Sequence, residues 1–126
     1  MSDAPRRVLV VKDEVLINML IEDMLVDLGH EVEGAAHHYD AALALARGEG
    51  FDLALLDLQV DGMTTYAVAD ILIARGIPFA FVTGRDKGGI APAYAGVPVL
   101  QKPFHAEDLA AIVARLAGKG TSEPEG

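Results

Sequence analysis

Charged or hydroxyl-bearing side chains directly follow apolar runs at four places in the sequence: Lys12-Asp13-Glu14, Asp57, Thr83 and Lys102. A carboxylate such as Asp57 can act as a nucleophile toward a phosphoryl group, provided that a cation neutralises the oxygens as negative charge accumulates. Asp13 is a hard oxygen ligand suited to Mg²⁺, and the backbone carbonyl of Gln59 could supply another. The hydroxyl of Thr83 and the ammonium of Lys102 could each donate a hydrogen bond to a phosphoryl oxygen. These residue types predict a phosphoryl-accepting site, if the fold brings them together.

The apolar pattern alternates between strand-like and helix-like segments. Short apolar or β-branched runs predict four strands, over residues 7–11, 52–56, 77–82 and 97–100, and residues 31–34 form a weaker fifth candidate. Helical spacing of apolar residues predicts four helices, over residues 15–29, 39–47, 65–75 and 106–117. The segment 85–96 holds three glycines and Pro92, so we expect a short or mobile fourth helix there.

This alternation predicts an α/β fold, with a parallel sheet, right-handed crossovers and helices on both faces. Apart from residues 31–34, the predicted strands are mostly apolar rather than alternating, as expected when both faces of a sheet are covered. Ligands of such sheets bind outside the carboxyl ends of the strands, where the strand order reverses. The residues that follow the predicted strands should therefore converge at one edge of the sheet.

The runs VLVVKDE, LALLDLQVDGM, FAFVTG and LQKPF stand in the order of the motifs of response-regulator receiver domains, which this sequence resembles over about residues 7–117. The resemblance implies a flavodoxin-like fold, a five-stranded doubly wound parallel sheet with strand order 2-1-3-4-5. It implies that Asp57 is the phosphoacceptor and that Asp13 is a direct Mg²⁺ ligand. Thr83 would be the switch hydroxyl and Lys102 the lysine that senses the phosphoryl group.

Some positions depart from the family pattern or adjust it. The run PFAFVTG is similar to a single-domain subset that reads Pro-Phe-x-Phe-Ala-Thr-Gly, with Val82 in place of the alanine. Val99 replaces the usual aromatic residue of the fifth strand, so the usual coupling between threonine and that aromatic side chain cannot operate. Gly84 leaves room for the phosphoryl group, while Gln59 and Arg85 occupy positions that flank it and tune how long it survives.

Lys12 stands where the family usually has a second acidic residue beside Asp13. Asp13 and Asp57 carry two negative charges, and Lys12 and Lys102 carry two positive ones, so the pocket would be near neutral and Mg²⁺ would be weakened or replaced. Three positions of Lys12 stay open. Its ammonium could pair with Asp57 or Asp13 and stand in for Mg²⁺, it could extend to water while Asp13 and Glu14 hold the metal, or it could be a solvated residue at a strand end.

Two functions follow from these observations. The first is a single-domain response regulator, not an enzyme, that accepts a phosphoryl group on Asp57 from a histidine kinase or phosphotransfer protein and then binds a downstream protein target. The alternative is a phosphorylation-impaired pseudo-receiver, a protein-binding module whose acidic pocket is neutralised by Lys12. The kinase, the target and the oligomeric state cannot be read from the sequence.

Composition limits the class of protein. A net charge of −9 and an isoelectric point near 4.7 argue against nucleic-acid and anionic-membrane partners. There is no cysteine, no apolar run as long as a membrane span and no signal peptide, so we expect a cytoplasmic protein. We expect one domain over residues 7–117, with disordered ends at 1–6 and 118–126.

Overall fold

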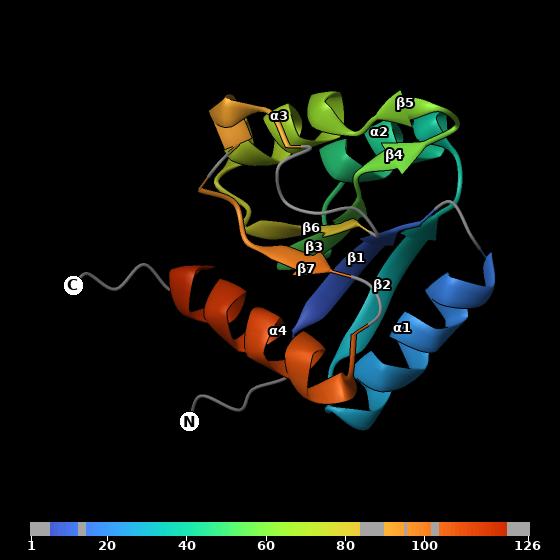
Figure 1. The fold of residues 1–126 in the computed structure, drawn as a ribbon, viewed down its shortest axis with the longest axis vertical. Helices are drawn as coiled ribbons and strands as arrows, with labels where there is room; N and C mark the ends of the chain where they lie inside the picture. Colours follow the sequence, from blue (N-terminus) through green and yellow to red (C-terminus); the bar gives the residue numbers. More distant parts are fainter. Residues whose placement is uncertain (1–5, 13–14, 84–89, 95, 102–103, 121–126) are drawn as a thin grey trace.

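A five-stranded parallel sheet forms the centre of the molecule, with strand order β2-β1-β3-β6-β7 (Figure 1). The computed structural model describes residues 6–12, 15–83, 90–94, 96–101 and 104–120. The strands of the sheet are β1 (Arg7–Val11), β2 (Glu31–Ala36), β3 (Leu53–Asp57), β6 (Phe79–Thr83) and β7 (Val99–Gln101). Counted among these five strands alone, the order is 2-1-3-4-5, so the predicted doubly wound, flavodoxin-like fold is confirmed.

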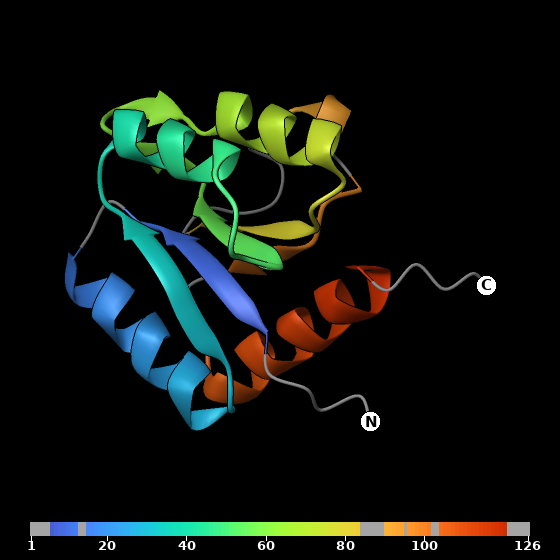
Figure 2. The same cartoon turned by 180° about the vertical axis from the view of Figure 1, so that it is seen from behind.

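Helices cover both faces of the sheet (Figures 1 and 2). One layer holds α2 (Tyr39–Arg47) and α3 (Tyr66–Arg75), and the other holds α1 (Val15–Asp27) and α4 (Ala106–Gly120). Side chains alternate across the strands, so that Leu9 and Val11 join the core under α2 and α3, whereas Val8 and Val10 join the core under α1 and α4. Two separate hydrophobic cores therefore hold the sheet from both sides, which is why β1, β3 and β6 are mostly apolar, whereas the edge strand β2 carries exposed Glu31 and Glu33.

The register of the sheet sets which residues meet at its carboxyl edge. Val11 of β1 pairs with Leu56 of β3, and Asp57 pairs with Val82 of β6. Thr83 pairs with Gln101 of β7. The residue after Val11 is therefore level with the residue after Leu56, so Lys12 and Asp57 lie opposite each other on neighbouring strands.

A short antiparallel hairpin, which the sequence analysis missed, lies between β3 and α3. Its strands are β4 (Gln59–Val60) and β5 (Met63–Thr64), joined by Asp61 and Gly62. Both turn residues have positive φ, 56° for Asp61 and 77° for Gly62, as a tight hairpin turn requires. The Asp-Gly pair was the available signal, but strands of two residues are too short to produce a periodic pattern.

Several predicted boundaries are wrong by a few residues. Helix α4 continues to Gly120, past the predicted end at residue 117, because glycine weakens a helix without forbidding it. At the other end of the chain, Arg6 was predicted to be disordered, but its carbonyl accepts a hydrogen bond from Glu31 at 2.9 Å. In the segment 85–96 the described residues hold one short helical turn, η2 (Pro92–Tyr94), as predicted. The ends predicted to be disordered lie, for residues 1–5 and 121–126, outside the described part.

None of the helices in the described part of the chain is long and apolar enough to span a membrane.

Gly76 ends α3 in the left-handed conformation, with φ of 72°, and its N–H donates to the carbonyls of Ile73 and Leu72. A Cβ built at Gly76 meets no atom within 4 Å, so backbone strain is the main cost of a side chain there. We expect Gly76→Ala to lower the free energy of unfolding, measured by urea denaturation, by about 1 kcal/mol. Gly96→Ala is the matched control, because its Cβ also meets nothing within 4 Å and its φ is not positive. Equal losses in the two variants would contradict this explanation.

Candidate functional site

Asp57 is the last residue of β3, and its backbone is held by the start of α3. The hydroxyl of Thr65 donates to the carbonyl of Asp57 at 2.7 Å and lies 3.3 Å from the carbonyl of Leu58. Thr65 is fully buried, and its N–H also donates to Leu58 at 2.9 Å. In the sequence, Thr65 is only the first residue of the helix predicted over residues 65–75, and its bond to Asp57 has no local signature. Thr65 fixes the turn that presents the Asp57 carboxylate at the sheet edge.

Lys12 points into the site and pairs with Asp57. Its ammonium nitrogen lies 3.4 Å from Oδ2 of Asp57, and the Lys12 side chain is 0% exposed, whereas that of Asp57 is 14% exposed. A buried ammonium is stable only beside an opposite charge, which Asp57 supplies. Of the three positions that the sequence left open, the structure has the first, in which Lys12 faces the carboxylate.

The Lys12 backbone is fixed by the extension of β2. Its N–H donates to the carbonyl of Ala36 at 3.0 Å, and its carbonyl is hydrogen-bonded to Nδ1 of His37 at 3.2 Å. These contacts hold both polar groups of the Lys12 backbone at the end of β1. The Lys12 side chain could therefore turn outward only by rotation about its own side-chain bonds, because the backbone is held in place.

The hairpin after β3 is tied to the start of α2 on the same side of the site. The N–H of Tyr39 donates to Oδ2 of Asp61 at 2.8 Å, and Nδ1 of His38 lies 3.5 Å from Oδ1. The hydrogen bond from Tyr39 lowers the pKa of the Asp61 carboxyl, with a smaller contribution from His38. Asp61 is thus held as an anion beside His38, and it fixes the loop that follows Asp57.

The other predicted site residues divide into two groups. Thr83 is buried at the end of β6, one residue beyond the partner of Asp57, and Gln59 is exposed on β4. Asp57, Thr83 and Lys12 are therefore brought to one edge of the sheet, as predicted. The remaining predicted residues lie outside the described part of the structure: Asp13, Glu14, Gly84, Arg85 and Lys102.

In the described part of the site, the carboxylate available to Mg²⁺ at the end of β3, that of Asp57, already contacts the ammonium of Lys12. Magnesium demands oxygen ligands at about 2.0–2.1 Å, and Asp57 is the described carboxylate nearest to Lys12. A metal on Oδ2 of Asp57 would share that atom with an ammonium 3.4 Å away. The attraction between the Lys12 ammonium and the Asp57 carboxylate at this separation is roughly 5 kcal/mol at an effective dielectric near 20, before desolvation is counted. Among the described residues, no three histidine, aspartate or glutamate side chains gather as a metal site.

A second group of side chains is an aromatic cluster on one face of β6. It consists of Phe79 and Phe81 of β6 together with Tyr66 and Tyr94. The rings of Tyr66 and Tyr94 are stacked with centroids 4.4 Å apart, and Phe81 lies edge-on to both at 6.0 Å. Tyr66 accepts a hydrogen bond from the N–H of Ala91 at 2.8 Å. These contacts dock the segment that follows β6 onto α3.

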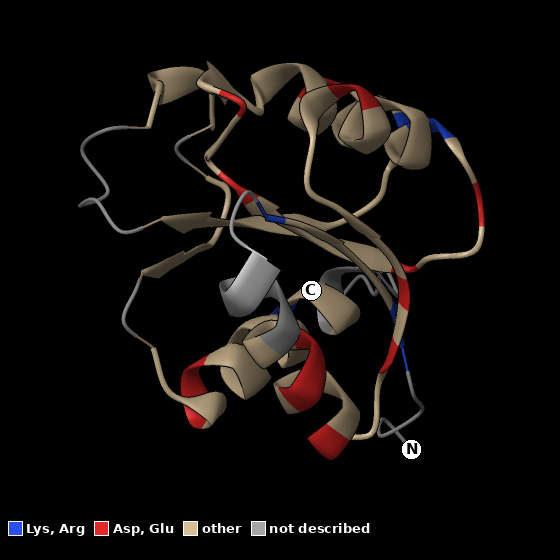
Figure 3. Cartoon of the chain, turned by 90° about the vertical axis from the view of Figure 1, so that its right-hand side faces the viewer, with Lys and Arg blue, Asp and Glu red and all other residues tan. Residues whose placement is uncertain are grey.

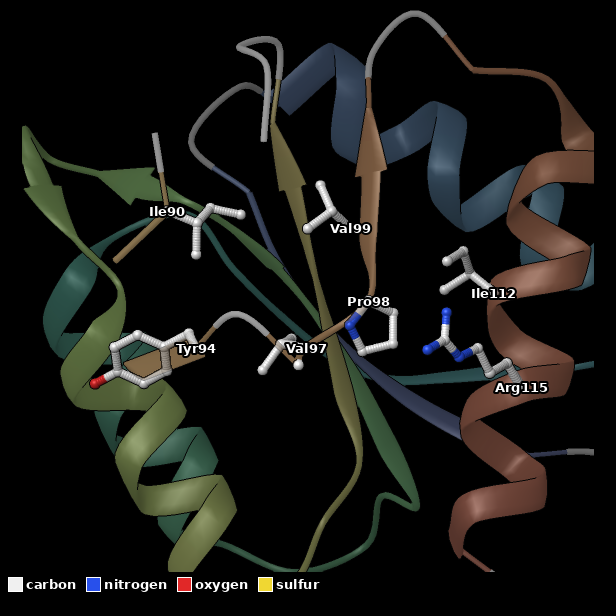
Figure 4. Close-up of a pocket in the computed structure, with 8 residues that line it drawn as sticks. Ile90, Tyr94, Val97, Pro98, Val99, Ile112 and Arg115 are labelled. Carbon is white, nitrogen blue, oxygen red and sulfur yellow. The ribbon is translucent and has the colours of Figure 1, made fainter. Parts of the chain in front are cut away.

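A cavity among the described residues lies beside β7 and is separate from Lys12 and Asp57. Its volume is about 510 Å³, and it is lined by Ile90, Tyr94, Gly96, Val97, Pro98, Val99, Ile112 and Arg115. Figure 4 shows Tyr94 on one side of this cavity, Ile112 and Arg115 of α4 on the other, and Pro98 and Val99 between them. Asp and Glu residues are spread over the helices of both layers (Figure 3). The cavity thus combines mostly apolar residues with one cationic side chain, that of Arg115, on a molecule of net negative charge.

Comparison with known proteins identifies the same architecture. Residues 8–114 match the family model described as the response regulator receiver domain. The transcriptional regulatory protein PdtaR of Mycobacterium tuberculosis is 34% identical over 111 residues, which cover 83% of this chain and 53% of PdtaR. This chain spans about half the length of the curated relatives that it matches.

Two solved structures extend this comparison. SdrG from Sphingomonas melonis Fr1 is 38% identical, with a TM-score of 0.80 over 92% of this chain and 98% of SdrG. The receiver domain of the sensor histidine kinase PA1611 from Pseudomonas aeruginosa PAO1 is 26% identical, with a TM-score of 0.79 over 91% of this chain and 99% of that domain. That domain was solved with a magnesium ion coordinated in its active site cleft.

The ion pair predicts a non-additive response to mutation. Asp57→Asn leaves the Lys12 ammonium buried beside a neutral amide, so we expect it to lower the free energy of unfolding by about 3 kcal/mol. Lys12→Met removes the buried cation, so the double variant Lys12→Met/Asp57→Asn should recover most of that loss. Urea denaturation of the four proteins gives the coupling free energy. Additive losses would mean that the two charges do not interact.

The hydroxyl of Tyr94 should lose its proton at a higher pH than an ordinary tyrosine does. Its hydroxyl donates to Oδ1 of Asp70 at 2.7 Å, and this hydrogen bond, with a smaller effect of burial, raises the pKa of Tyr94 to about 12. Folding thus favours the protonated hydroxyl, which contributes stability below pH about 10 that is lost as the pH rises through about 12. Ultraviolet titration of the phenolate bands should show one tyrosine with a raised pKa.

Variants identify that tyrosine. Tyr94→Phe should remove the part of the ultraviolet titration curve that has the raised pKa. Asp70→Asn should move the pKa of that part toward the ordinary tyrosine range. Circular dichroism at each pH verifies that the protein stays folded. A titration with a raised pKa that remains in Tyr94→Phe would contradict the assignment of that pKa to Tyr94.

Proposed function

Because this chain belongs to the response regulator receiver domain family, we propose that it is a signalling switch that accepts a phosphoryl group on Asp57. The observation that carries the proposal is the position of the Asp57 carboxylate at the carboxyl edge of β3, with a cation 3.4 Å away and Thr83 at the end of the neighbouring strand. That edge is where ligands of doubly wound sheets bind.

The chemistry is a displacement at phosphorus. A carboxylate oxygen of Asp57 forms a bond to the phosphorus atom, and the bond from phosphorus to the donor nitrogen of a phosphohistidine breaks. The histidine ring, which is protonated on its other nitrogen, leaves with the bonding electron pair as neutral imidazole. In this proposal Thr83 and Lys102 donate hydrogen bonds to phosphoryl oxygens, and the roles of Asp13, Glu14 and Gly84 stay as predicted from the sequence. Gln59 and Arg85 set how long the acyl phosphate survives.

The partners in this proposal are proteins. A histidine kinase or phosphotransfer protein supplies the phosphoryl group, and a downstream target reads the altered surface. The cavity between Tyr94 and Arg115 supports β7 and its neighbours as the surface that is read, because it is open and because Tyr94, which lines it, packs against Phe81 of β6. Phosphorylation would act by repacking this region.

The contact between Lys12 and Asp57 favours a second candidate. If the ammonium held the carboxylate permanently, Asp57 would not react, and the chain would act as a protein-binding module in one fixed state. The same fold and the same surface would then serve a partner without a phosphoryl signal. The two candidates differ in whether the wild-type protein acquires a phosphoryl group.

Intact-mass spectrometry after incubation with phosphoramidate separates them. We expect one phosphoryl adduct on the wild type and none on Asp57→Asn, because the acceptor oxygen is lost. Asp52→Asn is the matched control, since Asp52 is a carboxylate at the opposite end of β3, 38% exposed and paired with Arg7. An adduct that persists in Asp57→Asn would move the acceptor elsewhere, and no adduct on the wild type would favour the protein-binding module.

A further inference from the structure

We propose that the ammonium of Lys12 is the resident cation of the Asp57 pocket and that phosphoryl acceptance on Asp57 proceeds without a divalent metal. This inference rests on the proposed function. Receiver domains bind a magnesium ion beside the acceptor carboxylate. Among the described residues of this chain, the buried ammonium of Lys12 instead lies 3.4 Å from that carboxylate. The inference concerns how this chain neutralises charge at its own nucleophile.

The position of Lys12 is built into the fold. The main chain at Lys12 is bonded on both sides, to Ala36 and to His37, and the side chain has no exposed surface. Lys12 and Asp57 follow Val10 and Leu55 by two residues, and both of these pack in the core under α1 and α4. The two side chains therefore leave neighbouring strands on the same face and at the same level, which directs the ammonium to the carboxylate.

An ammonium can do the electrostatic part of the work of a metal. Transfer of a phosphoryl group to a carboxylate brings two anions together, so a fixed cation beside both lowers the barrier. Lysine carries three N–H donors on a compact charge, and it is a common phosphate ligand in proteins. With Asp57 as one contact, the same ammonium can also donate to an oxygen of the incoming phosphoryl group.

The same position disfavours magnesium. A dication on the Asp57 carboxylate would stand beside the buried ammonium and repel it, and magnesium accepts only oxygen ligands in a strict octahedral arrangement. In the PA1611 receiver domain the cleft does hold a coordinated magnesium ion. The described part of the present site instead has a lysine against its acceptor carboxylate.

Phosphoramidate makes the test chemically simple. An oxygen of Asp57 forms a bond to phosphorus, the bond between phosphorus and nitrogen breaks, and the protonated nitrogen of phosphoramidate leaves as ammonia with the bonding pair. We would follow the adduct by intact mass, with either a chelator or excess Mg²⁺ present. The wild type should react at the same rate, within about twofold, in both conditions, because its cation is covalently attached.

Variants at position 12 test the role of the ammonium. Lys12→Met, which keeps an unbranched stem without the charge, should react at least about tenfold more slowly with the chelator present. Lys12→Asp should react only with Mg²⁺, because it restores an acidic residue. Arg7→Met is the matched control, since Arg7 is a cation at the other end of β1, 49% exposed, and its loss should leave the rate unchanged. Circular dichroism of each variant verifies folding.

Thermal unfolding with and without Mg²⁺ gives a second readout that does not depend on reaction. A ligand that binds the folded state raises the unfolding temperature, so Mg²⁺ should stabilise Lys12→Asp and leave the wild type unchanged. Stabilisation of the wild type equal to that of Lys12→Asp would overturn the role of Lys12.

The outcomes separate this inference from the function on which it rests. An adduct on the wild type that requires Mg²⁺ would overturn the role of Lys12 and retain Asp57 as the acceptor. An adduct on Lys12→Asp alone would also overturn it and favour the protein-binding module. No adduct on either protein would overturn the proposed function itself.

Discussion

A buried ammonium is stabilised inside a protein by an anion close to it, and among the described residues the carboxylate of Asp57 lies 3.4 Å from the ammonium nitrogen of Lys12. The contact requires β1 and β3 to be neighbours in the sheet, in the register that pairs Val11 with Leu56. A shift of one residue would turn one of the two side chains to the opposite face. The site is thus a direct consequence of strand order and register.

The crossover topology supplies that order. Strand β2 lies on one side of β1 and β3 on the other, so the chain reverses direction across the sheet at β1, and the carboxyl ends of β1 and β3 open onto the same edge. Two hydrophobic cores fix the strands from opposite faces, which leaves the register little freedom. Thr65 then secures the Asp57 carbonyl from the start of α3, so three elements position one carboxylate.

Much of the fold could be predicted from the sequence because it follows from local patterns. Apolar strands that alternate with amphipathic helices leave few arrangements, and the parallel sheet was among them. The direction of Lys12 could not be predicted, because it depends on β2 continuing to Ala36 and on His37 bonding the Lys12 carbonyl. The pairing of Tyr94 with Asp70 joins residues 24 positions apart and has no local signature. The roles of Asp13, Glu14, Gly84, Arg85 and Lys102 stay predictions from the sequence.

The aromatic cluster gives the site a connection to the surface beside β7, even though Val99 lacks the aromatic ring usual in the family. Along β6, Thr83 and Phe81 lie on the same face, and Phe81 contacts both Tyr66 and Tyr94. Along α3, Thr65 bonds Asp57 at the start of the helix, and Asp70 bonds Tyr94 one turn further on. Both routes end at Tyr94, which lines the cavity beside β7. Tyr94 is therefore the residue at which the hydrogen bonds of α3, which begin at Asp57, meet the ring contacts of β6.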